Sequence, residues 1–469
     1  MRNLNMKNFK SLCHVLLFTS FIVLTAVQAH GKSGDHIRYL PVQDSGRIKP
    51  FDTFAKETLE IIYGKKVYKA DEKSNPIEAH WVVLTWMLSP ESWIDRPLFE
   101  VRHFEVLEKL GLSKDKRYYT GEELFKTEKF SNIMQELANQ KESKEKLTPY
   151  FQALQRLENQ FFIFREIAGG RMLAVLPKPD SDQWYSVADL PELFQKKFLE
   201  ISKGTATFLG AKAEGKDADE AGIKLDDAVR SFVASAEKFN PEKYQVSKVN
   251  TEVLYNKVHP FRWAYIFYLL STLTILFIWI RKQEKGMTLA WTFLLTGFVI
   301  HTLGFVFRVY LAERPPVSNM YETVIWTSWG AILFSIILEK IYNFRVLLLG
   351  GGLTGLVALI VADFAPAVLD PSLQPLEAVL RSNYWLIVHV MTITISYAAF
   401  LLAFGLGDIG LIYYVIDAEK HKDTIQKLTT GVYRAMQIGV AFLTPGIILG
   451  GIWADYSWGR FWGWDPKET

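Results

Sequence analysis

The chain has 469 residues, of which 49% are hydrophobic and 22% are charged, and its formal net charge is +3. With a mean hydropathy of +0.07, it is too polar to lie wholly in a membrane and too apolar to be wholly soluble. The small positive charge comes without a basic patch that carries aromatic residues, so we expect no nucleic acid partner. The single cysteine, Cys13, excludes a disulfide framework and a CxxC motif within this chain.

The first 29 residues have the pattern of an export signal. Basic side chains at Arg2, Lys7 and Lys10 precede an apolar run from Val15 to Val27. The small residue Ala29 then fits a cleavage site. An uncleaved N-terminal anchor is the alternative. Either role predicts that the next residues lie outside the cytoplasm.

Residues 30–258 are polar and numerous enough to form a domain of their own. Leu40–Phe54 predicts an extended strand and a turn that lead into a helix capped by Thr53. Met172–Pro177 predicts a short strand, and Ala213–Gly222 predicts a charged loop. Apolar residues recur at helical spacing in four segments, 77–98, 121–142, 145–166 and 223–239. We therefore expect a mainly helical soluble domain outside the cytoplasm.

This polar part carries no catalytic motif. Its histidines are scattered, at His30, His36, His80 and His103. An isolated histidine is more often a surface residue or a hydrogen-bonded one than a ligand. The sequence therefore assigns no chemistry to residues 30–258.

From Phe261 onward the composition becomes strongly apolar. Six membrane spans can be drawn, at 261–280, 288–311, 323–342, 345–363, 384–416 and 432–453. Each is near or above the roughly 20 residues that a helix needs to cross a bilayer. The fifth is longer than that, so we expect it to tilt or to project. The predicted fold class is an all-α polytopic membrane protein over 259–469, preceded by the signal or anchor and the helical domain.

Basic residues lie in alternate connections between these spans. They follow the first span at Arg281–Lys285, flank the connection after the third at Lys340 and Arg345, and fill the connection after the fifth. Basic loops stay in the cytoplasm. The other loops, 312–322, 364–383 and 454–469, are then expected on the outer face with the soluble domain. This pattern predicts a protein of the bacterial inner membrane with these parts in the periplasm.

The last stretch, Trp453–Thr469, is rich in tryptophan. Its indoles are Trp453, Trp458, Trp462 and Trp464. Tryptophan gathers at membrane interfaces, so an aromatic belt is one interpretation. The other is a stacking surface for a planar ligand, with Arg460 and Lys467 near enough in sequence to meet carboxylates on it. A flat macrocycle with two acidic arms, such as haem, would suit that surface.

The order of residues in this stretch favours the second interpretation. WGRFWGWDPKE resembles the WWD signature of a haem-handling protein family, which includes the CcsA half of System II cytochrome c synthases and the CcmC and CcmF proteins of System I. Arg314–Thr323 resembles the P-x-SN-x-YE stretch of CcsA-type proteins, and Leu373–His389 resembles their LQP…WL-x-x-H stretch. The resemblance covers 261–469.

The resemblance implies that the protein handles haem b during cytochrome c biogenesis. Haem would lie on the four indoles, with Arg460 and Asp465 also in the site, and would be presented for thioether attachment to the CxxCH motif of apocytochrome c. The chain would then be a component of a haem lyase. The implied partners are apocytochrome c, a CcsB/ResB-type membrane protein and thiol-reducing proteins.

Two histidines within the spans are candidate ligands. His389 lies about one and a half turns inside the fifth span, where an imidazole is costly unless it is paired or ligating. In the family this histidine is an axial haem ligand. His301 lies near the middle of the second span, and it either ligates haem or bonds a neighbouring helix. Arg308, two turns further along, either meets a propionate or extends to the headgroups.

The sequence stops directly after the WWD motif, whereas family members continue with two more histidines. We therefore expect either a truncated chain or a second axial ligand from another polypeptide or solvent, and the activity of residues 1–469 alone stays open. A haem exporter or carrier without ligase activity is the main alternative function. A transporter that stacks sugars on its tryptophans is a third.

Overall fold

The structure is a computed structural model that describes residues 33–71, 73–125, 128–143, 146–281, 286–366, 368–374 and 384–464. The predicted signal or anchor at 1–29 lies outside the described residues. So do Asp465 and Lys467. The chain divides after Val253 into two compact units.

The N-terminal unit is mostly helical, as predicted, and also contains three small antiparallel sheets. The largest has the strand order β2-β1-β7-β8. The strands are β1 Pro41–Asp44, β2 Arg47–Pro50, β3 Val67–Tyr68, β4 Ile77–Glu78, β5 Phe99–Glu100, β6 Tyr118–Tyr119, β7 Ala174–Pro177 and β8 Trp184–Ser186. The helices and 3-10 turns are η1 Asp35–Tyr39, α2 Phe51–Tyr63, α3 Ala79–Leu88, η2 Pro90–Trp93, α4 Phe104–Leu110, α5 Gly121–Phe125, α6 Glu128–Glu142, α7 Pro149–Ala168, η3 Val187–Asp189, α8 Glu192–Ala213 and α9 Asp219–Phe239. Helix α10, Val246–Val258, contains the boundary between the two units.

The predicted strand, turn and helix over 40–54 are confirmed. Strands β1 and β2 pair from Pro41 opposite Pro50 to Asp44 opposite Arg47. The two residues between the strands, Ser45 and Gly46, both have positive φ, which is the twist that a tight hairpin turn requires.

Two other expectations for this unit were less accurate, and one helix was missed. Thr53 is not the helix cap, because α2 already begins at Phe51 and the Thr53 hydroxyl donates to Glu252. The loop expected over 213–222 is shorter, since α9 begins at Asp219. Helix α8 was not predicted, although its buried Phe194, Phe198 and Ile201 follow helical spacing.

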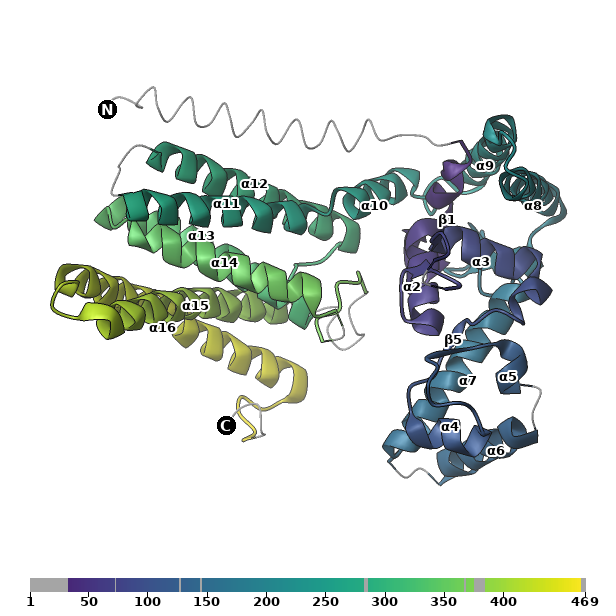
Figure 1. The fold of residues 1–469 in the computed structure, drawn as a ribbon, viewed down its shortest axis with the longest axis horizontal. Helices are drawn as coiled ribbons and strands as arrows, with labels where there is room; N and C mark the ends of the chain where they lie inside the picture. The colour runs from purple at the N-terminus through teal and green to yellow at the C-terminus, as the bar shows by residue number, and fades with distance from the viewer. Residues whose placement is uncertain are drawn as a thin grey trace. The chain divides into compact units, whose positions relative to one another are not determined.

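The C-terminal unit is a multi-pass membrane bundle. Six of the described helices are long and apolar enough to cross a membrane, which confirms the predicted number. They are α11 Pro260–Arg281, α12 Met287–Ala312, α13 Met320–Tyr342, α14 Val346–Phe364, α15 Tyr384–Asp417 and α16 Lys422–Trp458. Consecutive helices run in opposite directions, so the connections after α12 and α14 and the segment after α16 lie at the same end of the bundle (Figure 1). We call it the tryptophan end.

The sixth span was predicted too short at both ends. Helix α16 covers 37 residues and, beyond Trp453 at the end of the predicted span, includes Trp458, which we expected in the loop 454–469. It ends where Gly459 adopts φ +69° and its N–H bonds the Asp455 carbonyl, a conformation that glycine adopts without strain. The first half of the tryptophan stretch is therefore held rigidly on a helix.

Candidate functional site

His389 is held by a backbone carbonyl of the neighbouring helix. Its Nδ1 lies 2.7 Å from the Gly446 carbonyl oxygen on α16. A carbonyl only accepts, so Nδ1 must carry the proton and Nε2 must present its lone pair. In the described part of the chain Nε2 has no hydrogen-bond partner, and the residue is partly exposed. Metal-ligating histidines usually donate their second nitrogen in this way, which fixes the ring and its tautomer.

Glycines on α16 make this contact possible. A Cβ on Gly450 would lie 2.6 Å from Cε1 and 2.9 Å from Nδ1 of His389, so the imidazole rests directly on the helix backbone. One turn earlier, a Cβ on Gly446 would lie 3.2 Å from the Ile393 side chain. Small residues at such spacing let membrane helices approach closely. The packing of α15 on α16 therefore sets the position of the ring.

The tryptophan stretch begins on the same face of α16. Trp453 is seven residues beyond Gly446, which is nearly two turns, so the two residues point in similar directions. Its ring lies 4.7 Å from that of Trp458, edge to face. The Nε1 of Trp453 is buried and has no hydrogen-bond partner among the described residues. This N–H is therefore available to donate a hydrogen bond to a ligand.

After Gly459 the chain turns back along α16. The Phe461 ring packs onto Gly451, and the Arg460 guanidinium packs onto Gly463. The rings of Trp462 and Trp464 are then 6.1 Å apart, again edge to face. Trp464 is 77% exposed and Trp458 is 50% exposed. The stretch thus presents partly exposed indole rings. It follows Gly446 and Gly450, the glycines that contact His389 and Ile393, directly in the sequence.

His301 has different surroundings. It is fully buried on α12, and its Nδ1 lies 3.1 Å from the Tyr268 hydroxyl on α11. Its ring stacks on Phe305 with a centroid distance of 5.2 Å. Its ring also contacts Phe261 on α11, and the Ile325 backbone on α13 lies close to it, so its neighbours come from α11, α12 and α13. Its Nε2 is buried and has no hydrogen-bond partner among the described residues. The structure therefore does not bring His301 and His389 together.

Arg308 does not extend to the headgroups. It is buried, and its Nη2 lies 2.8 Å from Oε1 of Glu322 on α13. Arg314 bonds the other oxygen of Glu322 at 2.7 Å and also donates to the Gln374 carbonyl. Arg308 donates to the Pro371 carbonyl at 3.0 Å. This network joins two connections at the tryptophan end. The connection after α12 carries the Arg314–Thr323 stretch, and the connection after α14 carries the start of the Leu373–His389 stretch. The sequence signal that could have revealed this network was an arginine inside the second predicted span together with a glutamate directly before the third.

The comparisons with known proteins agree with these features. Residues 317–469 match the family described as Cytochrome C assembly protein. The chain is 28% identical to protein NrfI of Wolinella succinogenes over 456 residues, which covers 90% of this chain and 47% of NrfI. It is 35% identical to the cytochrome c biogenesis protein CcsA of Mesostigma viride over 209 residues, 36% of this chain and 67% of that protein. CcsA of Guillardia theta is 32% identical over 179 residues, 33% of this chain and 58% of that protein.

The match with NrfI includes much of the N-terminal unit, because it covers 90% of the chain and the C-terminal unit contains a far smaller share of the residues. The chain spans about half the length of NrfI. The CcsA proteins match over a shorter part of the chain. On these similarities, the chain belongs to the cytochrome c assembly protein family.

Proposed function

We propose that this protein acts in cytochrome c biogenesis by binding haem b at the tryptophan end and presenting it to apocytochrome c. The observation that carries the proposal is His389: its Nδ1 is anchored to the Gly446 carbonyl, and its Nε2 has no hydrogen-bond partner among the described residues. The ring packs on Gly450, three residues before Trp453 begins the tryptophan stretch. An imidazole fixed in this way is ready to ligate iron without further ordering.

The surrounding residues fit the rest of the ligand. The partly exposed indoles of Trp458, Trp462 and Trp464 offer apolar faces for a planar macrocycle. The partnerless Nε1 of Trp453 can donate to an acidic group, and Arg460 can pair with one. Asp465, expected to shape the end of the stretch, lies outside the described residues.

The protein's contribution would be positioning. When haem is bound, its vinyl groups react with the two cysteine thiols of a CxxCH motif; a carbon–sulfur bond forms and the thiol proton passes to the other vinyl carbon. This addition consumes no oxidant, but it requires free thiols, which accounts for thiol-reducing partners. His389 and the indoles would hold the reacting edge in one orientation and exclude others.

We also propose the sidedness. Basic residues fill the connections at the end of the bundle opposite the tryptophan end. The tryptophan end would then face the periplasm together with the N-terminal unit. A CcsB/ResB-type membrane partner, or another chain segment, would supply the second axial ligand. We assign His301 to helix packing, because Tyr268 and Phe305 surround it.

The test is spectroscopic. The full chain is purified from cells supplied with haem, and its visible spectrum is compared with that of His389→Ala and of His421→Ala, a control in the charged connection after α15. We expect His389→Ala to lose the haem absorbance bands that the original protein shows and His421→Ala to keep them. A His389→Ala protein with an unchanged spectrum would exclude the role assigned to His389.

A second measurement separates presentation from transport. Cells that lack the protein are scored for covalent haem on c-type cytochromes and for b-type haem. Loss of all c-type cytochromes with normal b-type haem supports presentation to apocytochrome c. A change in pooled haem with c-type cytochromes still forming would instead indicate an exporter or carrier.

A further inference from the structure

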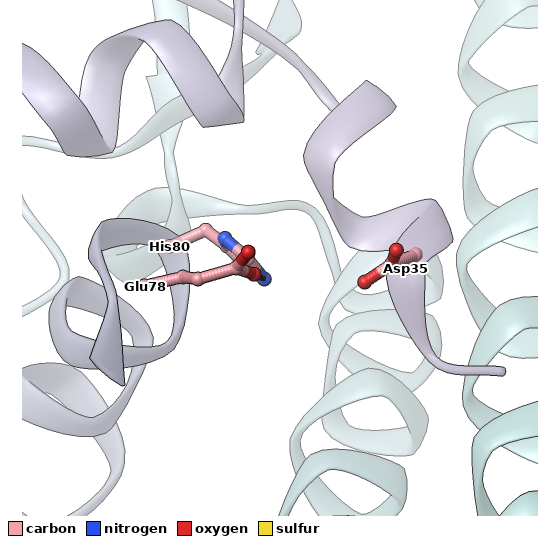
Figure 2. A group of neighbouring side chains, drawn as sticks. All are labelled: Asp35, Glu78 and His80. Carbon is pink, nitrogen blue, oxygen red and sulfur yellow. Dashed lines mark ion pairs between the residues drawn. The ribbon is translucent and has the colours of Figure 1, made fainter. Parts of the chain in front are cut away.

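Three side chains of the N-terminal unit form a cluster that the proposed function does not use. Asp35 comes from η1, Glu78 from β4 and His80 from the first turn of α3. Each offers one ligand atom, and these atoms all lie within 4.8 Å of one another. Figure 2 shows the Glu78 carboxylate beside the His80 ring, with the Asp35 oxygens directed toward both across a gap.

His80 is the unusual member. It is 1% exposed, yet neither ring nitrogen has a hydrogen-bond partner among the described residues. A buried imidazole without partners is rare, because each lost hydrogen bond to water goes unreplaced. Burial and the nearby cations Arg38, Lys56 and Lys212 hold the pKa of His80 well below its usual value.

The spacing around His80 matches metal coordination. Its Nε2 lies 3.6 Å from Oε2 of Glu78. Two ligands at about 2.1 Å from a zinc-like ion, at an angle slightly above tetrahedral, are separated by about that distance. On its other side, Nδ1 lies 4.0 Å from Oδ1 of Asp52, a buried oxygen that also lacks a hydrogen bond. A carboxylate behind the second nitrogen is the usual support of a metal-bound histidine.

Arg38 at present neutralises these carboxylates. Its guanidinium contacts Glu78 and lies 3.5 Å from Asp35 and 3.7 Å from Asp52. Because its side chain is 22% exposed, it has a path to solvent. Lys56 pairs with Asp52 at 2.6 Å.

The local charge favours an exchange of Arg38 for a divalent ion. Three carboxylates face two cations, Arg38 and Lys56, which leaves one negative charge. More distant Lys212 and Asp226 add one charge of each sign. Replacing Arg38 with a doubly charged ion would bring the sum to zero.

We propose that Asp35, Glu78 and His80 bind one divalent first-row transition metal ion of the zinc type, with His80 ligating through Nε2, Asp52 supporting Nδ1, and Arg38 competing for the same carboxylates. Mixed oxygen and imidazole ligands suit such ions. The ion would tie η1 to the start of α3. This site is separate from the proposed haem surface and does not depend on it.

The test is equilibrium dialysis of the purified full chain, without an oligohistidine tag, against zinc ions after treatment with a chelator. We expect one zinc ion per chain that is lost in His80→Ala and in His80→Gln, the latter preserving side-chain volume. Asp52→Asn should weaken binding about 10–100-fold, as loss of an outer-shell partner does. His103→Ala, outside the cluster, should bind like the original protein.

Arg38→Gln gives the most specific outcome. If Arg38 competes with the ion, removing its charge should tighten zinc binding, whereas a surface histidine site would be unaffected. Circular dichroism melts of each variant show whether it is folded. Zinc binding that survives both His80 substitutions, or that weakens in Arg38→Gln, would overturn the proposal.

Discussion

His301 and His389 lie in the same helical bundle but differ in what their ring nitrogens contact. His301 bonds a tyrosine hydroxyl, which can donate or accept, so the contact leaves the tautomer undefined. His389 bonds a backbone carbonyl, which only accepts, so the tautomer is fixed and Nε2 is left for a ligand. Depth in a span alone does not separate the two roles. The partner of Nδ1 and the exposure of the ring do.

The surroundings of the two histidines extend this contrast. Near His301, the same helix carries Arg308, whose charge is fully paired within the Glu322 network. In the tryptophan stretch, which begins three residues after Gly450, the indoles are partly exposed and the Trp453 N–H has no partner among the described residues. Because Nε2 of His301 also has no hydrogen-bond partner among the described residues, exposure is what separates the two rings. The fully enclosed ring favours a structural role, and the partly exposed one favours a ligand. Substitutions around His301 should therefore lower the melting temperature, whereas substitutions around His389 should weaken haem binding.

The largest effect is expected at Glu322. Glu322→Ala would leave Arg308 and Arg314 buried without their carboxylate, which costs about 3–5 kcal/mol of stability when one partner of a buried pair is removed. Thermal unfolding of the full chain in detergent measures it, with exposed Glu419→Ala as the control. A melting temperature equal to that of the control would mean that the network does not stabilise the bundle.

The second-largest loss of stability is expected for His301→Ala. It removes a buried ring and leaves the Tyr268 hydroxyl unpaired, for a loss of about 2 kcal/mol or more. If His301 only packs, the melting temperature falls but the haem spectrum of the folded protein keeps the bands of the original protein. Loss of those bands from folded His301→Ala protein would show that His301 ligates haem and would break the contrast.

Much of this bundle could be predicted from the sequence, because long apolar runs identify spans without any knowledge of packing. The start of α16 was missed since Lys422–Arg434 is too polar to resemble a span. Its end was missed because tryptophan and glycine favoured a loop. The position of His389 was predictable from its spacing, but its Gly446 partner was not, since the two are 57 residues apart and meet only through helix packing.

Gly450→Ala tests whether that packing sets the ring. The added methyl group would overlap Cε1 of His389, and overpacking of this kind costs about 1–3 kcal/mol. Because the overlap is with the ring itself, we expect a displaced imidazole and weaker haem binding in titrations of the purified protein. Gly407→Ala on α15 is the matched control, since a Cβ there meets nothing within 4 Å. Equal haem affinity in the two variants would show that His389 is not held by this contact.

The smallest effect is expected at the open end of the tryptophan stretch. Trp464 is 77% exposed, so Trp464→Ala should leave the melting temperature unchanged. Aromatic stacking contributes about 0.5–1.5 kcal/mol beyond area burial, so haem affinity should fall by roughly twofold to thirteenfold. Tyr456→Ala is the control, because Tyr456 is 78% exposed on the last turns of α16 and is not part of the proposed surface. If Trp464→Ala binds haem as tightly as Tyr456→Ala does, the exposed indole belongs to the membrane interface and not to the ligand.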